Sequence, residues 1–77
     1  MEHLRLDLRT AALVRFSACV ASGRASVDIC VEDALGNGLS VPDLYDALVV
    51  GRDIGLDTDT IAATQDSIRR HQQLRAR

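Results

Sequence analysis

Apolar positions recur with a helical period along most of the chain. From Leu8 to Ser22 nearly every residue is apolar or small, with Asp7 as a good N-cap and Gly23 as a natural stop. The apolar side chains form two faces: Leu13, Phe16 and Val20 on one, Val14, Ala18 and Ala21 on the other. A helix that is apolar on more than one side must be covered on more than one side. The pattern predicts a helix over 8–22 that is buried between subunits.

A second helix is predicted after Ser26, which is a suitable N-cap for the run VDICVEDAL. Its apolar residues recur at steps of three and four. The segment Gly36-Asn37-Gly38 then stops the helix, because these residues tolerate the positive φ that such an ending requires. Gly38 is the best candidate for that conformation.

A third helix is predicted immediately after this stop. Ser40 is its N-cap, Pro42 lies in the first turn, where a missing N–H costs nothing, and Asp43 completes a capping box. Gly55 is expected to end the segment. Two helices joined by so short a corner predict a central antiparallel αα-hairpin.

The fourth predicted helix, within 56–77, has a weak apolar stripe and is capped by Asp57 or Thr58. Its large apolar side chains are Ile61, Ile68 and Leu74. We expect it to cover a partner's surface or to fray at its end, with 67–77 as a basic tail. The predicted fold is all-α: a small helical bundle forming one domain over 1–77.

Composition favours assembly. The 77 residues include one Phe, one Tyr and no Trp, yet 47% of the chain is apolar. A core of this size is marginal by itself. Because small aliphatic chains often complete their core against another subunit, we expect a homo-oligomer.

Net charge is −2, so the chain as a whole does not resemble a nucleic-acid-binding protein. The last nine residues, RRHQQLRAR, nevertheless carry four arginines and no acid. Such a tail can contact phosphates, but it equally suits a solvated helix end, where positive charge complements the helix dipole. Nucleic acid is not expected as a partner.

The N-terminal run MEHLRLDLR is charged throughout, unlike a signal peptide, and no apolar run is long enough to cross a bilayer. We expect a cytoplasmic protein that does not enter a membrane. Cys19 and Cys30 would be reduced in that compartment. Their C-x10-C spacing matches neither a zinc site nor a redox C-x-x-C, so both are interpreted as small buried hydrophobes. No metal or cofactor is expected.

Three pieces of sequence in order, LDLRTAALVRFSACVASG, CVEDALGNGLS and PDLYDALVVG, cover about two-thirds of the chain. This stretch, from Leu6 to about Gly55, resembles the carboxymuconolactone decarboxylase / AhpD-like family. The resemblance implies an all-helical, oligomeric protein. It also implies one of two chemistries, a thiol peroxidase type or a cofactor-free decarboxylase type.

The thiol enzymes of that family carry C-x-x-C-x-x-x-H with a Glu upstream. Aligned on this family pattern, Gly23 and Ser26 occupy the two Cys places and Cys30 the His place. The upstream Glu falls near Ala11 or Ala12. A thiol relay needs a low-pKa thiolate, a resolving thiol and a proton carrier, and none is placed here. The resemblance therefore implies a member without redox chemistry.

The decarboxylase type needs a general acid or base beside an anionic substrate. The candidate catalytic residues are Arg15, Glu32 and Cys30. Arg15 interrupts an apolar helix, so it either binds a carboxylate of a substrate or partner or extends to water. Glu32, like Asp33 beside it, is otherwise a solvated helix charge. His3 and His71 lie near the termini and are interpreted as surface residues.

Three functions follow. The favoured one is a non-redox oligomeric helical module that binds a protein partner or a small ligand, because the family's chemistry is missing. The second is a cofactor-free enzyme for a small carboxylated or lactone substrate, which a subunit-interface pocket lined by Arg15, Glu32 and Cys30 would favour. The third is a regulatory helical protein whose basic tail contacts nucleic acid.

Overall fold

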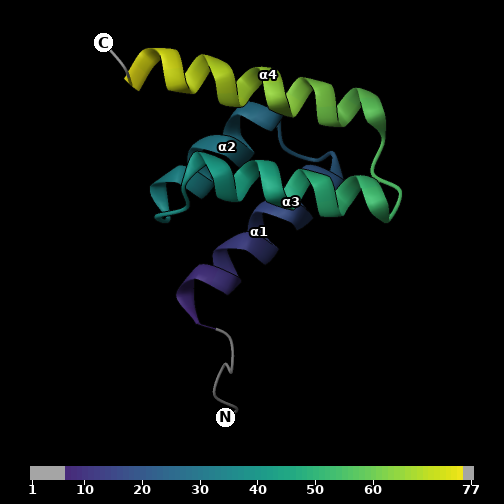
Figure 1. Cartoon of the computed structure of the whole chain (residues 1–77), viewed down its shortest axis with the longest axis horizontal. Coiled ribbons are helices and arrows are strands. Elements are labelled where there is room, and N and C mark those ends of the chain that lie inside the picture. The colour runs from purple at the N-terminus through teal and green to yellow at the C-terminus, as the bar shows by residue number, and fades with distance from the viewer. Residues whose placement is uncertain (1–6, 76–77) are drawn as a thin grey trace.

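The computed structural model describes residues 7–75, which fold into four helices (Figure 1). These are α1 (Leu8–Ser22), α2 (Val27–Gly36), α3 (Val41–Asp53) and α4 (Thr58–Arg75). No residue between 7 and 75 lies in a strand. The prediction of an all-α fold is confirmed. Residues 67–75 of the expected basic tail are helical.

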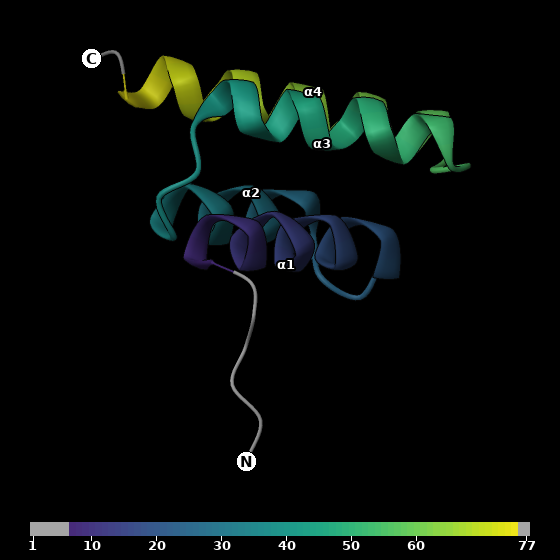
Figure 2. The same ribbon diagram turned by 60° about the horizontal axis from the view of Figure 1, so that its bottom comes forward.

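The helices form two layers, α1 with α2 and α3 with α4 (Figure 2). The chain reverses direction at each connection, and α1 lies against α3 while α2 lies against α4. α2 contacts α1 and α4 far more than it contacts α3. The central α2–α3 hairpin therefore stays a prediction. The most extensive contacts join α1 to α2 within one layer and α2 to α4 across the two layers.

Capping side chains explain where the helices begin. Asp7 and Ser26 accept backbone hydrogen bonds from the first turns of α1 and α2. Ser40 and Asp43 form both halves of a capping box at α3, with donor–acceptor distances of 2.9 and 3.3 Å. Asp57 caps α4 through a backbone N–H at 3.1 Å. Each of these bonds satisfies a helix N–H that has no partner within the helix.

α2 ends in a Schellman motif at the corner predicted from its glycines. The N–H of Gly38 donates to the carbonyl of Leu35 at 3.1 Å, and the N–H of Leu39 donates to that of Ala34 at 3.2 Å. Gly38 has a φ of 91°, as predicted. Leu39 is buried against the core, so the corner also fixes how the chain leaves α2.

A second motif of this kind ends α3. The N–H of Leu56 donates to the carbonyl of Gly51 at 2.8 Å, and Gly55 has a φ of 105°. A Cβ atom at Gly51 would lie 3.0 Å from Cδ2 of Leu56. The missing side chain of Gly51 therefore lets Leu56 fold back onto the helix end.

The core lies between the two layers. Each helix contributes one large, fully buried apolar side chain: Phe16, Val31, Leu44 and Ile68. Burying such a side chain stabilises the fold by about 1.5–3 kcal/mol. Leu13, Phe16 and Val20 were predicted to share a face, and this face of α1 packs against the core.

Candidate functional site

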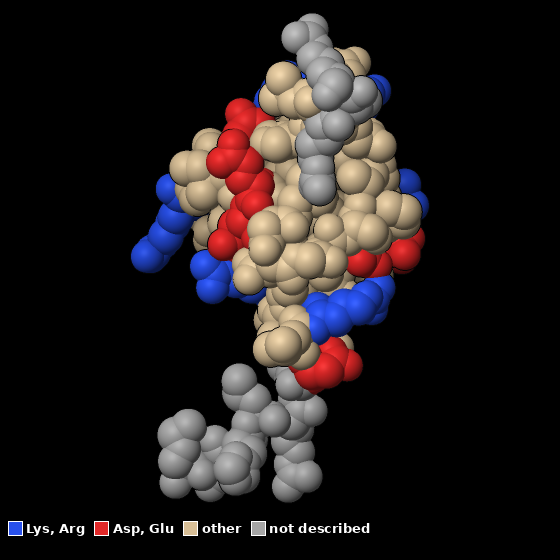
Figure 3. Space-filling view, turned by 90° about the vertical axis from the view of Figure 1, so that its left-hand side faces the viewer, with Lys and Arg blue, Asp and Glu red and all other residues tan. Residues whose placement is uncertain are grey.

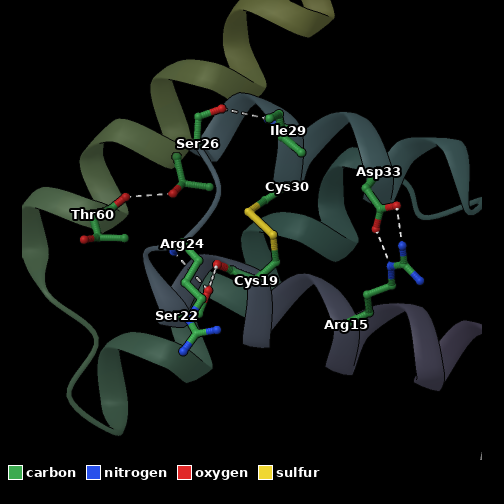
Figure 4. The surroundings of a disulfide bond; sticks show 10 residues. Arg15, Cys19, Ser22, Arg24, Ser26, Ile29, Cys30, Asp33 and Thr60 are labelled. Carbon is green, nitrogen blue, oxygen red and sulfur yellow. Dashed lines mark hydrogen bonds and ion pairs between the residues drawn. A yellow bond between two sulfur atoms is a disulfide. The ribbon is translucent and has the colours of Figure 1, made fainter.

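Cys19 and Cys30 form a disulfide that joins α1 to α2 (Figure 4). Their Cα atoms are 5.8 Å apart. Cys30 is fully buried and Cys19 is half-buried at the edge of the core. The prediction of two reduced thiols is wrong for this structure, because the antiparallel helices bring the last turn of α1 opposite the first turn of α2.

Arg15 lies one turn before the disulfide on α1 and binds a carboxylate of its own chain. Its Nε is 2.7 Å from Oδ2 of Asp33, and a terminal guanidinium nitrogen is 3.0 Å from Oδ1 (Figure 4). This two-point contact uses the geometry by which an arginine would hold a substrate carboxylate. Arg15 thus acts here as a link between α1 and α2.

Glu32 points in another direction, toward α4. Its Oε2 lies 3.5 Å from Nε2 of His71. The three candidates Arg15, Glu32 and Cys30 therefore lie in three separate surroundings: an ion pair, a contact with α4 and a disulfide. Neither of the two larger surface hollows is lined by any of them.

A polar cluster joins α2 to α4. The Asp28 carboxylate accepts hydrogen bonds from the hydroxyl of buried Ser67 and, at 2.8 Å, from the guanidinium of Arg70. These bonds lower the pKa of Asp28, with the Ser67 hydroxyl as the largest cause and Arg70 next. Arg70 also pairs with Asp66, and the carboxylate of Asp28 raises the pKa of Arg70.

His71 belongs to the same cluster, where its Nδ1 lies 2.8 Å from the carbonyl oxygen of Ser67. It is half-buried between α4 and α2, so its interpretation as a surface residue is wrong. His3 lies outside the described residues. The cluster consists of side chains that hold one another, which makes it a structural contact between two helices.

Acidic and basic side chains are intermingled on the face shown in Figure 3, and uncharged residues cover most of that face. The pairing of Arg70 with two carboxylates fits this distribution. On this face the charges do not form the single-sign patch by which proteins attract nucleic acid.

The strongest candidate binding surface is a groove along the outer side of α1 and α3, with a volume of about 640 Å³. We call it the α1–α3 groove. Its apolar lining includes Val14, Ala18 and Ala21 of α1, Ala47 and Val50 of α3, and Ile54 directly after α3. Arg9 and Asp43, which form an ion pair, lie at one end. A second hollow of about 430 Å³ shares Ala21, Ala47 and Ile54 with it and continues to the turn after α3.

The groove exposes large apolar side chains. Val14 is 55% exposed, Val50 is 60% exposed and Ile54 is 83% exposed. Single exposed apolar residues are common, whereas several around one hollow make that hollow a candidate binding surface. The α1 wall is the second apolar face predicted from the sequence. The other wall was not predicted, because neither Val50 nor Ile54 was assigned to a face of its helix.

No protein-family model, curated protein or solved structure matches the chain. Within residues 7–75, no helix has the length and apolar character needed to cross a membrane. The fold and the site define a small all-α domain with an apolar groove on its outer side.

Proposed function

We propose that this chain is a non-redox, oligomeric helical module of the carboxymuconolactone decarboxylase-like type, and that it binds a second copy of itself through the α1–α3 groove. The observation that supports this proposal most is the exposure of Val14, Val50 and Ile54 around one apolar hollow. Removing such surface from water favours association by about 25 cal/mol per Å².

The lining of the groove supports a helix as its occupant. Ala18 and Ala21 on one wall and Ala47 on the other are small, so a partner helix can approach closely. Val50 and Ile54 of the second copy supply the projecting apolar side chains. In a two-fold dimer the same patch serves both copies, which makes one groove sufficient for assembly.

The family resemblance supports the same proposal, since it implies an oligomeric helical protein. Gly23 and Ser26 stand where the thiol enzymes have cysteines, and Cys30 is bonded to Cys19. The module is therefore proposed to catalyse no thiol relay of its own. We also propose a cytoplasmic location.

The two alternatives gain less support. A decarboxylase would need Arg15, Glu32 and Cys30 around one substrate, and these residues lie apart. A nucleic-acid contact through the tail would need free arginines, and the two tail arginines whose side chains the structure describes, Arg69 and Arg70, pair with carboxylates of the same chain. A wild-type chain that is monomeric in the experiment that follows would favour a protein partner or a small carboxylated ligand as the occupant of the groove.

The experiment compares two neighbouring valines of α3. Val50 lines the groove, whereas Val49 is 48% exposed and lines a different, small hollow. We expect Val50→Asp to weaken self-association about 100-fold, because it places a charge in an apolar interface. Val49→Asp should associate like the wild type. Sedimentation equilibrium at micromolar concentration measures both.

A wild-type chain that is monomeric at these concentrations and melts cooperatively would contradict the proposal. Equal effects of the two aspartates would contradict the assignment of the interface to this groove. Circular dichroism checks that both variants stay folded, which their exposure in the single chain predicts.

A further inference from the structure

The disulfide and the groove meet on one helix. Ala18 and Ala21 line the groove, while Cys19 lies between them in the sequence and faces α2 (Figure 4). Residues one or two positions apart on a helix point to different sides. The disulfide therefore fixes the α1 wall of the groove from the side of the helix that faces α2.

The contact between α1 and α2 carries two cross-links in register. Arg15 and Cys19 are four residues apart on α1, and their partners Asp33 and Cys30 are three apart on α2. The ion pair is exposed to water and its contribution is correspondingly weak. The disulfide is thus the stronger link, and it is the one nearer to the end of α1.

The two cysteines differ in burial. Cys30 is fully buried, whereas Cys19 is half-buried, so the disulfide is more open to an incoming thiol from the side of Cys19. A disulfide found in a reducing compartment is usually transient or redox-sensing. The half-buried position of Cys19, together with the proposed cytoplasmic location, points to a bond that opens and closes.

We propose that the Cys19–Cys30 disulfide is a reversible redox lock on the α1–α3 groove, opened by a dithiol reductant. When it is closed, the last turns of α1 are held in the arrangement that receives the second copy. When it is open, these turns loosen and association weakens. The effect on association rests on the proposed function, and the loosening of α1 rests on the disulfide alone.

The chemistry is a two-step exchange. A thiolate of the reductant attacks Sγ of Cys19, the S–S bond breaks, and the electron pair leaves on Sγ of Cys30, which takes up a proton. The second thiol of the reductant then attacks the reductant's first sulfur, which is bonded to Sγ of Cys19 in the mixed disulfide. This attack releases Cys19 as a thiolate, which is then protonated. The dithiol becomes a disulfide, and two electrons and two protons pass to the protein.

The test treats the full chain with dithiothreitol in the absence of denaturant. Alkylation followed by mass spectrometry measures free thiols, and amide hydrogen exchange measures local opening. We expect reduction of the folded chain, faster exchange in residues 17–22 than in α4, and a dissociation constant raised about tenfold. Reoxidation should reverse all three.

The double variant Cys19→Ala with Cys30→Ala should behave like the reduced chain and should not respond to dithiothreitol. If this variant does not fold, reduced wild type provides the comparison. The lock is wrong if thiols appear only when the chain unfolds globally, or if exchange in residues 17–22 is the same in both redox states. A monomeric oxidised chain contradicts the proposed function, while the exchange measurement still decides the lock.

Discussion

Gly36 and Gly38 lie two residues apart in one corner but meet different backbone demands. Gly38 has a φ of 91°, whereas Gly36 is the last residue of α2. A Cβ atom at either position would meet no atom within 4 Å. Any difference between substitutions at the two sites is therefore due to the backbone and not to crowding.

We predict that Gly38→Ala lowers the free energy of unfolding by about 1–2 kcal/mol, because an alanine is strained at positive φ. Gly36→Ala is the matched control, and we expect it to raise stability by up to about 1 kcal/mol, since alanine favours the helix. Urea denaturation followed by circular dichroism measures both. Equal shifts of the two midpoints would show that the corner does not require a glycine at 38.

Local signals at single residues predicted the helix ends well. Asp7, Ser26 and Ser40 cap the helices that they were expected to cap, because a cap depends only on the next three residues. The disulfide depends on the contact between two helices, which no local motif predicts. The sequence does contain a signal for it, because each cysteine lies one turn from the connection between these helices: Cys19 is four residues before Gly23, and Cys30 is four residues after Ser26.

α4 shows what a count of large apolar residues misses. Ile61 and Ile68 are buried, whereas Leu74 is 66% exposed, so only two of its three large apolar residues face the core. The buried face is completed by Thr64 and Ser67. The Thr64 hydroxyl donates to the carbonyl of Thr60 at 2.7 Å, which allows its burial. The contact of α4 with α2 is therefore partly polar.

Asp28 makes this contact sensitive to acid. Its pKa is lowered from 3.8 in the folded chain, mainly by the Ser67 hydroxyl and then by Arg70. A carboxyl group with a lowered folded pKa stabilises the fold fully above its unfolded pKa, and this stabilisation is lost as pH falls through the folded value. The stabilisation by Asp28 is therefore lost as the pH falls below 3.8.

We predict that Asp28→Asn reduces the dependence of unfolding free energy on pH in that acidic range, at the expense of stability near neutral pH. Asp53→Asn, at an exposed carboxylate of α3, serves as the control. Urea midpoints measured between pH 2.5 and pH 7 give the dependence for each variant. An unchanged acidic slope in Asp28→Asn would remove Asp28 from the acid response.

At the scale of the whole molecule, periodicity predicted four helices and their class but not their arrangement. The pairing of α2 with α4 joins segments distant in sequence, and it depends on Ser67 and Asp28, whose polar side chains carry no apolar signal. The predicted second face of α1 does lie on the outside. The other wall of the groove depends on the contact between α1 and α3, which the sequence pattern does not give.

The contact between α1 and α2 offers a direct comparison of its two cross-links. The disulfide closes a loop with a sequence separation of 11, for which restriction of the unfolded chain stabilises the fold by about 2–3 kcal/mol. The ion pair of Arg15 with Asp33 is exposed, and such pairs contribute less than about 1 kcal/mol. A domain of this size has only about 5–10 kcal/mol in total.

We therefore predict that Cys19→Ala with Cys30→Ala lowers the free energy of unfolding several times more than Arg15→Ala does. Reduced wild type should fall close to the double alanine variant, because both have lost the same restriction on the unfolded chain. Urea denaturation of all four forms at one protein concentration gives the ranking, with free thiols blocked to prevent reoxidation. If Arg15→Ala costs as much as loss of the disulfide, then α1 is held to α2 by charge, and opening the disulfide could not release the wall of the groove.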